Sequence, residues 1–274
     1  MPTPIGNLED LSFRALKRLS EAEVFFCEDT RVTKKLLSLL KERFNATFQE
    51  NARFISLHSH NENETIDKLD PVLFERPCVY VSDAGMPAVS DPGAKLVMWC
   101  KERQIPYEVL PGANAALTAY AASGELSGRF LFYGFLPHKQ EARKAELLPL
   151  LASPWAIVLY EAPHRIQSLI ELLRECAPDR LIEAFKELTK LHEKHLWGDA
   201  QTVAEQIRQT NTKGEWVVVV HPGSAVGSRA EAWLIDALSE LQAPVKPLSK
   251  ILARLTDENA SLWYDRLQEK KQQK

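Results

Sequence analysis

Residues 79–93, VYVSDAGMPAVSDPG, join a short apolar run to two turns of small and acidic residues. The apolar run predicts a buried strand, and Asp91 followed by Pro92 predicts the N-cap and first position of a helix. Asp83 would then lie where a parallel strand ends, beside small residues that let a ligand approach the backbone. A carboxylate there suits a ribose hydroxyl or a cationic ligand, and an ordinary structural loop is the alternative.

Short apolar runs of this kind alternate with amphipathic helical stretches along most of the chain. Such alternation predicts an α/β fold with largely parallel sheets flanked by helices, in which ligands bind beyond the carboxyl ends of the strands. The runs that we expect to form strands are 24–27, 54–57, 79–82, 107–110, 130–136, 156–160, 181–185, 195–197 and 217–220.

Two breaks divide this pattern into three parts. Near Gly112 an extended stretch gives way to a small-residue helix over 113–122, and residues 222–228 have the Gly- and Ser-rich composition of a linker. Beyond that linker the periodicity is purely helical, over 230–241, 248–255 and 261–267. We therefore expect an α/β lobe over 1–111, a second α/β lobe over 112–222 and a helical appendage over 229–274.

The composition is that of a globular protein. Hydrophobic residues make up 45% of the 274 residues and charged residues 26%, with a formal net charge of −3. This balance argues against an electrostatic grip on nucleic acid by the whole protein, so an RNA substrate would need local basic patches. The scattered cysteines, the histidine pairs without a third ligand and the lack of a membrane-length apolar run predict a cytoplasmic protein without a metal.

Two further loops carry candidate ligand groups at expected strand ends. Residues 4–10, PIGNLED, place Asn7 as an N-cap with acidic residues in the first helical turn. Residues 111–116, PGANAA, supply small side chains and free backbone N–H groups at a helix start, which suits the polar edge of a ligand. Plain capping in the first loop and close helix–strand packing in the second are the alternatives.

Dense charged segments follow three of the expected strands. They are CEDTR at 27–31, EAPHR at 161–165 and FKELTK at 185–190. Because the carboxyl ends of parallel strands share one edge of a sheet, we expect these segments to line one cleft, with structural salt bridges as the alternative. The chain has no GxxxxGK[ST] motif and no GxSxG motif, which disfavours a P-loop nucleotidase and an α/β-hydrolase.

Taken together, these segments resemble the bacterial small-subunit ribosomal RNA methyltransferase I family, a branch of the tetrapyrrole methylases. The resemblance rests on TPIGNLEDLSFRAL, CEDTR, HSHNENE, VSDAGMPAVSDPG, LPGANAALTAYAASG, FYGFLPHK, YEAPHRI and FKELTKLHEKHLWG, which run in order from residue 3 to about residue 221. It implies two α/β lobes around a cleft, a homodimer, and S-adenosylmethionine as the methyl donor. It also implies 2′-O-methylation of a cytidine in 16S rRNA of the small ribosomal subunit.

The resemblance further assigns residues to this cleft. The residues expected to line the cofactor site are Pro4, Ile5, Gly6, Asp83, Ala84, Gly85, Met86, Pro87, Asn114, Ala115, Leu136, Ala162 and Pro163. At the RNA end, His164 and Arg165 are expected to contact the substrate, and Lys34, from the basic Lys34-Lys35 pair, could bind its phosphates, although such pairs are usually solvated surface. Since a ribose hydroxyl is weakly acidic, a base or a cation near the nascent alkoxide would help. Glu28, Asp29 and Glu187 are the candidate bases, and Lys186 and Arg31 are the candidate stabilising cations.

Two departures from the family pattern stand out. Met86 replaces a threonine that family members usually carry, which removes a hydroxyl whose hydrogen bond could contribute about 1 kcal/mol to cofactor binding. Related chains also precede TPIGNL with an apolar strand, and we hypothesise that the natural start lies upstream of Met1. The rival functions are a methyltransferase of the same fold acting on a tetrapyrrole or other small molecule, and an inactive RNA- or ribosome-binding protein.

Overall fold

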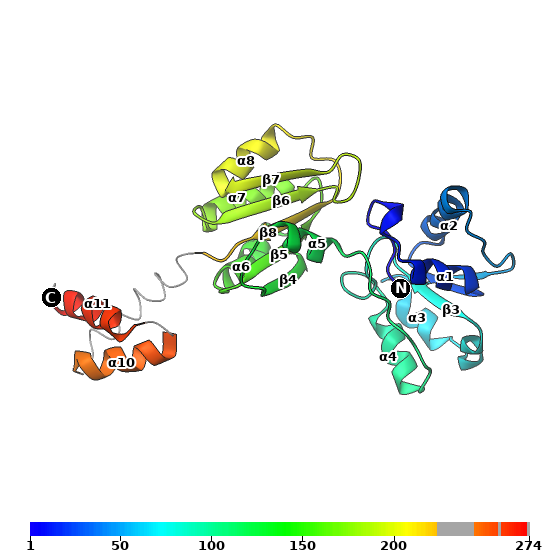
Figure 1. Cartoon of the computed structure of the whole chain (residues 1–274), viewed down its shortest axis with the longest axis horizontal. Coiled ribbons are helices and arrows are strands. Elements are labelled where there is room, and N and C mark those ends of the chain that lie inside the picture. Colours follow the sequence, from blue (N-terminus) through cyan, green and yellow to red (C-terminus); the bar gives the residue numbers. More distant parts are fainter. Residues whose placement is uncertain (224–243, 257–258, 273–274) are drawn as a thin grey trace.

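The computed structural model describes residues 1–223, 244–256 and 259–272, and its strands form two separate sheets (Figure 1). The strands are β1 (Val24–Cys27), β2 (Arg53–Ser56), β3 (Cys78–Val81), β4 (Phe130–Phe135), β5 (Ala156–Glu161), β6 (Leu181–Lys186), β7 (Lys194–Asp199) and β8 (Trp216–Val220). The α-helices are α1 (Phe13–Glu21), α2 (Thr30–Phe44), α3 (Glu62–Asp67), α4 (Ala94–Glu102), α5 (Ala115–Ala122), α6 (Gln140–Leu151), α7 (Ile166–Cys176), α8 (Ala200–Arg208), α10 (Val245–Thr256) and α11 (Ala260–Gln272). Two short 3-10 helices are η1 (Leu8–Asp10) and η2 (Pro71–Glu75).

The first lobe is built on a parallel sheet with the order β2-β1-β3. All four side chains of the central strand, β1, are buried, because helices cover both faces of the sheet. Leu19 of α1 and Leu37 of α2 belong to the core on one face, and Leu96 and Trp99 of α4 belong to the core on the other. The expected α/β architecture with parallel strands is confirmed here.

One strand that the sequence predicts is missing from this sheet. Residues 107–110 have no assigned secondary structure and do not join the ladder beside β3. The two are not in ladder contact: a cavity of about 620 Å³ is lined by Cys78, Val79 and Tyr80 of β3 on one part and by the 106–110 segment on another, and the N-terminal segment takes up part of the free edge of β3. At that edge of β3, the amino terminus of Met1 donates a hydrogen bond to the carbonyl oxygen of Tyr80 at 2.8 Å.

The second lobe contains a five-stranded sheet with the order β4-β5-β8-β6-β7. Only the β4–β5 pair is parallel; β8 runs antiparallel to both β5 and β6, and β7 runs antiparallel to β6. The expectation of largely parallel strands is therefore wrong for this sheet. β5 and β6 nevertheless point the same way, since the last residue of each, Glu161 and Lys186, pairs with Trp216 at the start of β8.

Helices cover the second sheet unequally. α6, α7 and α8 share a large core with one face, which includes Leu147, Ile170 and Val203. On the other face, Ala116 and Ala119 of α5 pack against the sheet, and Ile5 from the N-terminal loop joins the same core. The small side chains of α5 allow this close approach, and Ile5 ties the start of the chain to the second lobe.

The described part of the helical appendage is the pair α10 and α11. Trp263 and Leu267 of α11 are buried against Leu252 of α10. The predicted helix over 230–241 and residues 224–228 of the predicted linker lie outside the described residues. Within the described residues, none of the helices combines the length and the apolar character that crossing a membrane would require.

Candidate active site between the lobes

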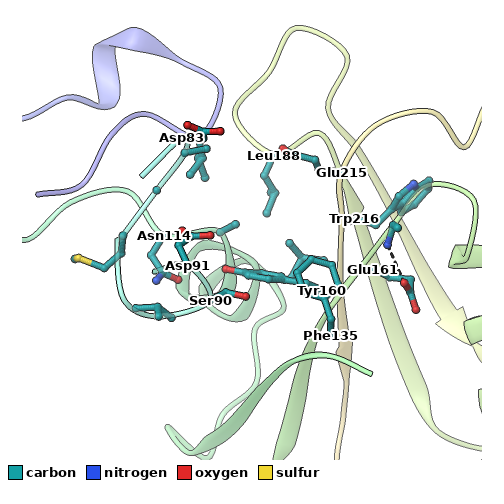
Figure 2. Close-up of a pocket in the computed structure, with 18 of the residues that line it drawn as sticks. Asp83, Ser90, Asp91, Asn114, Phe135, Tyr160, Glu161, Leu188, Glu215 and Trp216 are labelled. Atoms are coloured by element: carbon teal, nitrogen blue, oxygen red, sulfur yellow. Dashed lines mark hydrogen bonds between the residues drawn. The ribbon is translucent and has the colours of Figure 1, made fainter. Parts of the chain in front are cut away.

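A cavity of about 400 Å³ lies between the two lobes, within the size range of small-molecule sites (Figure 2). Its residues from the first lobe are Ile5, Glu28, Asp83, Ala84, Gly85, Met86, Val89, Ser90 and Asp91. Its residues from the second lobe are Asn114, Ala115, Phe135, Tyr160, Glu161, Ala162, Pro163, Leu188, Glu215, Trp216 and Val217. We call this space the interlobe cavity.

The N-terminal loop is fixed at the cavity by a pair of backbone hydrogen bonds. The amide of Thr3 donates to the carbonyl of Gly85, and the amide of Gly85 donates to the carbonyl of Thr3, both at 3.0 Å. Gly85 has φ +79°, and a Cβ atom on it would lie 3.1 Å from the side chain of Ile5. Glycine is therefore required at this position, where the loop after β3 meets the N-terminal loop.

The first lobe contributes three carboxylates to the cavity. The amide of Asp83 donates to Glu28 at 3.2 Å, and the carboxylate of Asp83 accepts from the amide of Asp29 at 3.0 Å. Burial and the charge of Glu28 raise the pKa of Asp83 above its ordinary value. The same causes, with the charge of Asp83 added, raise the pKa of Asp91 to about 6. This side of the cavity is thus acidic and suited to cationic or hydrogen-donating ligand groups.

Asp91 does not cap a helix, contrary to the sequence-based prediction. Helix α4 begins at Ala94, its N-cap is Gly93, and no side chain caps it. The backbone at Gly93 has φ +120°, and a Cβ atom there would lie 2.3 Å from the ring of Tyr80. This turn separates Asp91 from the helix, so its carboxylate lines the cavity instead (Figure 2).

The second lobe supplies a mainly apolar and aromatic wall. Figure 2 shows Leu188 and Trp216 on the side opposite Asp83 and Asp91. Tyr160 packs edge-on against Phe135 at 5.6 Å, and its hydroxyl accepts a hydrogen bond from the amide of Ala116 at 3.2 Å. This wall can hold a flat or apolar ligand group against the acidic side.

The start of α5 adds polar groups between the two sides. The Oδ1 atom of Asn114 caps the helix by accepting from the amide of Leu117 at 2.9 Å. The NH2 group of the same side chain is therefore the part that can donate a hydrogen bond to a ligand. Close helix–strand packing and a ligand contact, which the sequence left as alternatives for this segment, are geometrically compatible, because Ala116 packs in the core while Asn114 lines the cavity.

Comparison with known proteins identifies the family to which this fold belongs. The family model described as tetrapyrrole (corrin/porphyrin) methylases matches residues 2–204. The chain belongs to the tetrapyrrole methylase family. A protein named ribosomal RNA small subunit methyltransferase I from Helicobacter pylori is 41% identical over 286 residues, which covers 100% of this chain and 99% of the relative. A protein of the same name from Campylobacter fetus is 41% identical over 268 residues, covering 97% of this chain and 98% of the relative.

Solved structures support the same fold. A cobalt precorrin-4 methyltransferase aligns with a TM-score of 0.57 at 16% identity, over 81% of this chain and 92% of the other. Uroporphyrin-III C-methyltransferase from Thermus thermophilus, complexed with S-adenosyl homocysteine, aligns with a TM-score of 0.53 at 18% identity, over 80% of this chain and 94% of the other. At these identities the likeness establishes the methylase fold, and the substrates of the two enzymes do not carry over.

Most of the residues assigned to the methylase cofactor site lie together. Those that line the interlobe cavity are Ile5, Asp83, Ala84, Gly85, Met86, Asn114, Ala115, Ala162 and Pro163. Those that do not line it are Pro4, Gly6, Pro87 and Leu136. Gly6 packs against the side chains of Thr189 and Lys190, Pro87 lines the cavity beside β3, and the Leu136 side chain is in the second-lobe core.

Among the candidate catalytic residues, only Glu28 lines the cavity. Asp29 caps α2 and is paired with Arg31 at 2.6 Å, which lowers the pKa of Asp29 to about 2. Glu187 accepts hydrogen bonds from Lys190 and from the amide of Glu215, both at 2.8 Å, and its pKa is lowered in spite of partial burial. The cation of Arg31 and the carboxylates of Asp29 and Glu187 are thus engaged in local structure.

The remaining cationic candidates fall into two groups. Lys34 and His164 are exposed, and the ammonium of Lys34 lies 4.9 Å from the ring centroid of Phe54. Lys186 is buried at the end of β6, beside Trp216 in the sheet register. Exposed groups can meet a macromolecular substrate, whereas Lys186 cannot do so where it lies.

Arg165 departs from its expected role as a substrate contact. Its side chain is only 7% exposed and forms an ion pair at 3.0 Å with Glu161, which is fully buried. The guanidinium also donates to the carbonyl oxygens of Leu136 at 2.7 Å and Pro137 at 3.1 Å. The physical reason is local: the turn after β5 brings residues 161 and 165 together, and the buried carboxylate requires a cation.

Several cavity residues were not anticipated, in particular Ser90, Asp91, Phe135, Tyr160, Glu215 and Trp216. Tyr160 is the last residue of a predicted strand and Phe135 the last but one of another, so both could have been found by counting the final strand residues, and not only the loops after them, as candidates. Glu215 and Trp216 lie at the start of β8, which reaches the cavity because β8 runs antiparallel to its neighbours.

The residues present fit S-adenosylmethionine better than a metal ion. An acidic side suits its positive charge and its hydroxyl groups, and an aromatic and aliphatic wall suits its adenine. In the described part of the chain, His, Cys, Asp and Glu side chains form no group of three or more that could hold a metal ion.

Proposed function

We propose that this protein transfers the methyl group of S-adenosylmethionine to the 2′-hydroxyl of a cytidine ribose in 16S rRNA of the small ribosomal subunit. The observation that carries the proposal is identity of 41% with relatives named small-subunit rRNA methyltransferase I along essentially the whole length of both chains. The interlobe cavity supports it, because the sequence motifs shared with that family converge there.

The cofactor would lie in the interlobe cavity. It supplies a methyl group on a positively charged sulfur, whose departure leaves a neutral thioether. The chain's own contribution is to orient this donor: Asp83 and the Asn114 amide would bind its polar groups, and Leu188 and Val217 would exclude water from one side. Positioning of this kind can supply much of the acceleration of a methyl transfer.

The RNA would enter from the side of the CEDTR segment. Lys34 and Lys35 on α2 are exposed, as is His164 after β5, and these are the groups available to phosphate oxygens. With a formal net charge of −3, such local contacts would have to replace a general attraction to RNA. Arg165 would instead support the loop after β4, through its hydrogen bonds to the carbonyl oxygens of Leu136 and Pro137.

We also propose that the protein is a cytoplasmic homodimer. Exposed apolar side chains near α5, including Leu117 at 54% and Leu126 at 98% exposure, support an association surface. Four free cysteines support a reducing compartment. Sedimentation equilibrium of the full chain tests the dimer; a single species with the mass of one chain at micromolar concentration contradicts it.

The proposed reaction is tested by mapping ribose methylation across 16S rRNA in cells with and without the gene. One cytidine is expected to lose its 2′-O-methyl group in the deletion and to regain it when the gene is returned. An unchanged map contradicts the proposed substrate. Purified 30S subunits and a precorrin-type tetrapyrrole, each offered with labelled S-adenosylmethionine, then separate the RNA reaction from small-molecule methylation.

A further inference from the structure

We propose that Asp91 is the general base that removes the proton from the ribose hydroxyl during methyl transfer. This inference rests on the proposed function and adds a catalytic residue to it. Three features of the interlobe cavity support it: the well-anchored loop that carries Asp91, the lack of an ion-pair partner for its carboxylate among the described residues, and the hydrogen bonds and ion pairs that already engage the neighbouring acids.

The loop that carries Asp91 is anchored on both sides of Pro92. The hydroxyl of Tyr80, on β3, donates to the carbonyl of Pro92 at 2.7 Å, and the amide of Gly93 donates to Glu62 at 2.9 Å. Glu62 is itself buried and also paired with Lys95 at 3.3 Å. A side chain on so well-supported a loop can be held in one productive geometry.

The Asp91 carboxylate is available for chemistry. It caps no helix and forms no ion pair with any residue in the described ranges, and the hydroxyl of Ser82 is its neighbouring donor. It lines the interlobe cavity from the same lobe as Glu28 and Asp83, whose charges act on it. It therefore faces the space in which the reacting groups would meet.

Neighbouring carboxylates are less suitable. Asp29 is held by Arg31 and by its capping role, and Glu187 is held by Lys190 and the amide of Glu215. Both have lowered pKa values, so they are weak bases.

Glu28 and Asp83 face the cavity, but each of their carboxylates accepts a hydrogen bond from a backbone amide of the other residue's loop. Glu28 accepts from the amide of Asp83, and Asp83 accepts from the amide of Asp29. Their oxygens hold the junction of these two loops, whereas no backbone amide of the described residues donates to the Asp91 carboxylate.

Proton affinity supports this choice. Burial, together with the negative charges of Glu28 and Asp83, raises the pKa of Asp91 to about 6, well above that of an ordinary aspartate. A base with a pKa near the operating pH is ionised and still binds a proton well, which is the best compromise for general-base catalysis.

The ribose hydroxyl oxygen forms a bond to the methyl carbon while the bond from that carbon to the sulfonium sulfur breaks, and its electron pair stays on sulfur. The hydroxyl proton passes to a carboxylate oxygen of Asp91 and then to water after the methylated RNA leaves. The products are a methyl ether, a neutral thioether and the protonated carboxyl, which ionises again before the next turnover.

The test compares wild type, Asp91→Asn, Asp91→Glu and Asp179→Asn, the last an exposed control in the turn before β6. Single-turnover methylation of 30S subunits is measured from pH 5 to 9, with S-adenosylhomocysteine affinity measured by calorimetry. General bases typically contribute 10²–10⁴-fold, so we expect Asp91→Asn to lose at least about 100-fold in rate, with its Kd for S-adenosylhomocysteine changed less than about twofold. The wild-type rate should fall about tenfold per pH unit below 6, this inflection should vanish in Asp91→Asn, and Asp91→Glu should recover part of the rate.

Other outcomes overturn the inference in distinguishable ways. An Asp91→Asn rate and pH profile equal to those of wild type would show that Asp91 is not the base. A loss of S-adenosylhomocysteine affinity that matches the loss of rate would make Asp91 a cofactor ligand instead. If wild type binds S-adenosylhomocysteine but leaves 30S subunits unmethylated, the proposed RNA substrate itself is wrong.

Discussion

Replacement of Arg165 by methionine tests whether this residue supports the fold or contacts RNA. The side chain of Glu161 is fully buried, and Arg165, at 3.0 Å, is its ion-pair partner among the residues that the structure describes. Its second oxygen, Oε2, already has no hydrogen-bond partner. Removing the guanidinium would leave a buried carboxylate without its ion-pair partner, although the charge of the buried Arg143 still acts on it, and would take a donor from the carbonyl oxygens of Leu136 and Pro137.

The magnitude follows from this geometry. Removing one member of a buried ion pair costs about 3–5 kcal/mol, because the remaining charge is buried and uncompensated. In a domain of this size, such a loss lowers the melting temperature by roughly 10 °C. The control is Arg174→Met, on helix α7, for which Arg165 is the N-cap residue; the ion pair of Arg174 with Glu171 is exposed (47% and 38%) and should contribute less than about 1 kcal/mol.

The assay is urea denaturation followed by circular dichroism, with 30S binding measured on the same preparations. We expect Arg165→Met to lower the free energy of unfolding by several kcal/mol, and Glu161→Leu combined with Arg165→Met to regain much of it. A fully stable Arg165→Met variant with weakened 30S binding would refute this reasoning and restore the role in RNA binding expected from the sequence.

Three further predictions concern other parts of the molecule. Asp83→Ala should weaken the binding of S-adenosylhomocysteine about tenfold, or about 1.4 kcal/mol, because a charged hydrogen bond is lost, whereas Asp70→Ala at the start of η2 should leave the affinity unchanged. Equal affinities of the two variants in calorimetry would contradict this prediction. Gly93→Ala should lower the free energy of unfolding of the first lobe by about 1–3 kcal/mol more than Gly124→Ala lowers that of the protein, because both glycines have positive φ but only a Cβ atom at position 93 would clash with the Tyr80 ring, at 2.3 Å. Equal denaturation midpoints of the two variants would disprove the clash. Trp263→Ala should destabilise the α10–α11 pair by about 3–5 kcal/mol, whereas Leu262→Ala, at a half-exposed position, should change its stability little. Equal rates of hydrogen exchange over residues 245–272 in the two variants would contradict the buried role of Trp263.

The sequence was informative where local patterning decides structure. The positions of eight of the expected strands are confirmed to within a residue or two, because a buried strand needs an apolar run whatever its neighbours are. Strand direction is a different matter, since it depends on which strands pair. The antiparallel placement of β8 between β5 and β6 has no signature in its own residues, Trp216–Val220.

That missed direction explains much of what was overlooked in the candidate site. A rule based on the carboxyl ends of parallel strands found Asp83 and the 161–165 segment, but it could not find Glu215 and Trp216, which reach the cavity from the amino end of β8. The helix predicted from Asp91-Pro92 begins two residues later for a local reason: Asp-Pro is a common helix start, but the turn at Gly93, packed against the ring of Tyr80, delays the helix to Ala94.

The position of β8 has a consequence for synthesis of the chain. This strand lies between β5 and β6, although it is the last strand of the second lobe to be made, and all five of its side chains are buried. Until residue 220 leaves the ribosome, the β4–β5 and β6–β7 pairs each present an apolar unpaired edge. The nascent lobe therefore depends on a late, long-range closure, and its growing chain is most exposed to aggregation or chaperone capture just before translation reaches the end of β8.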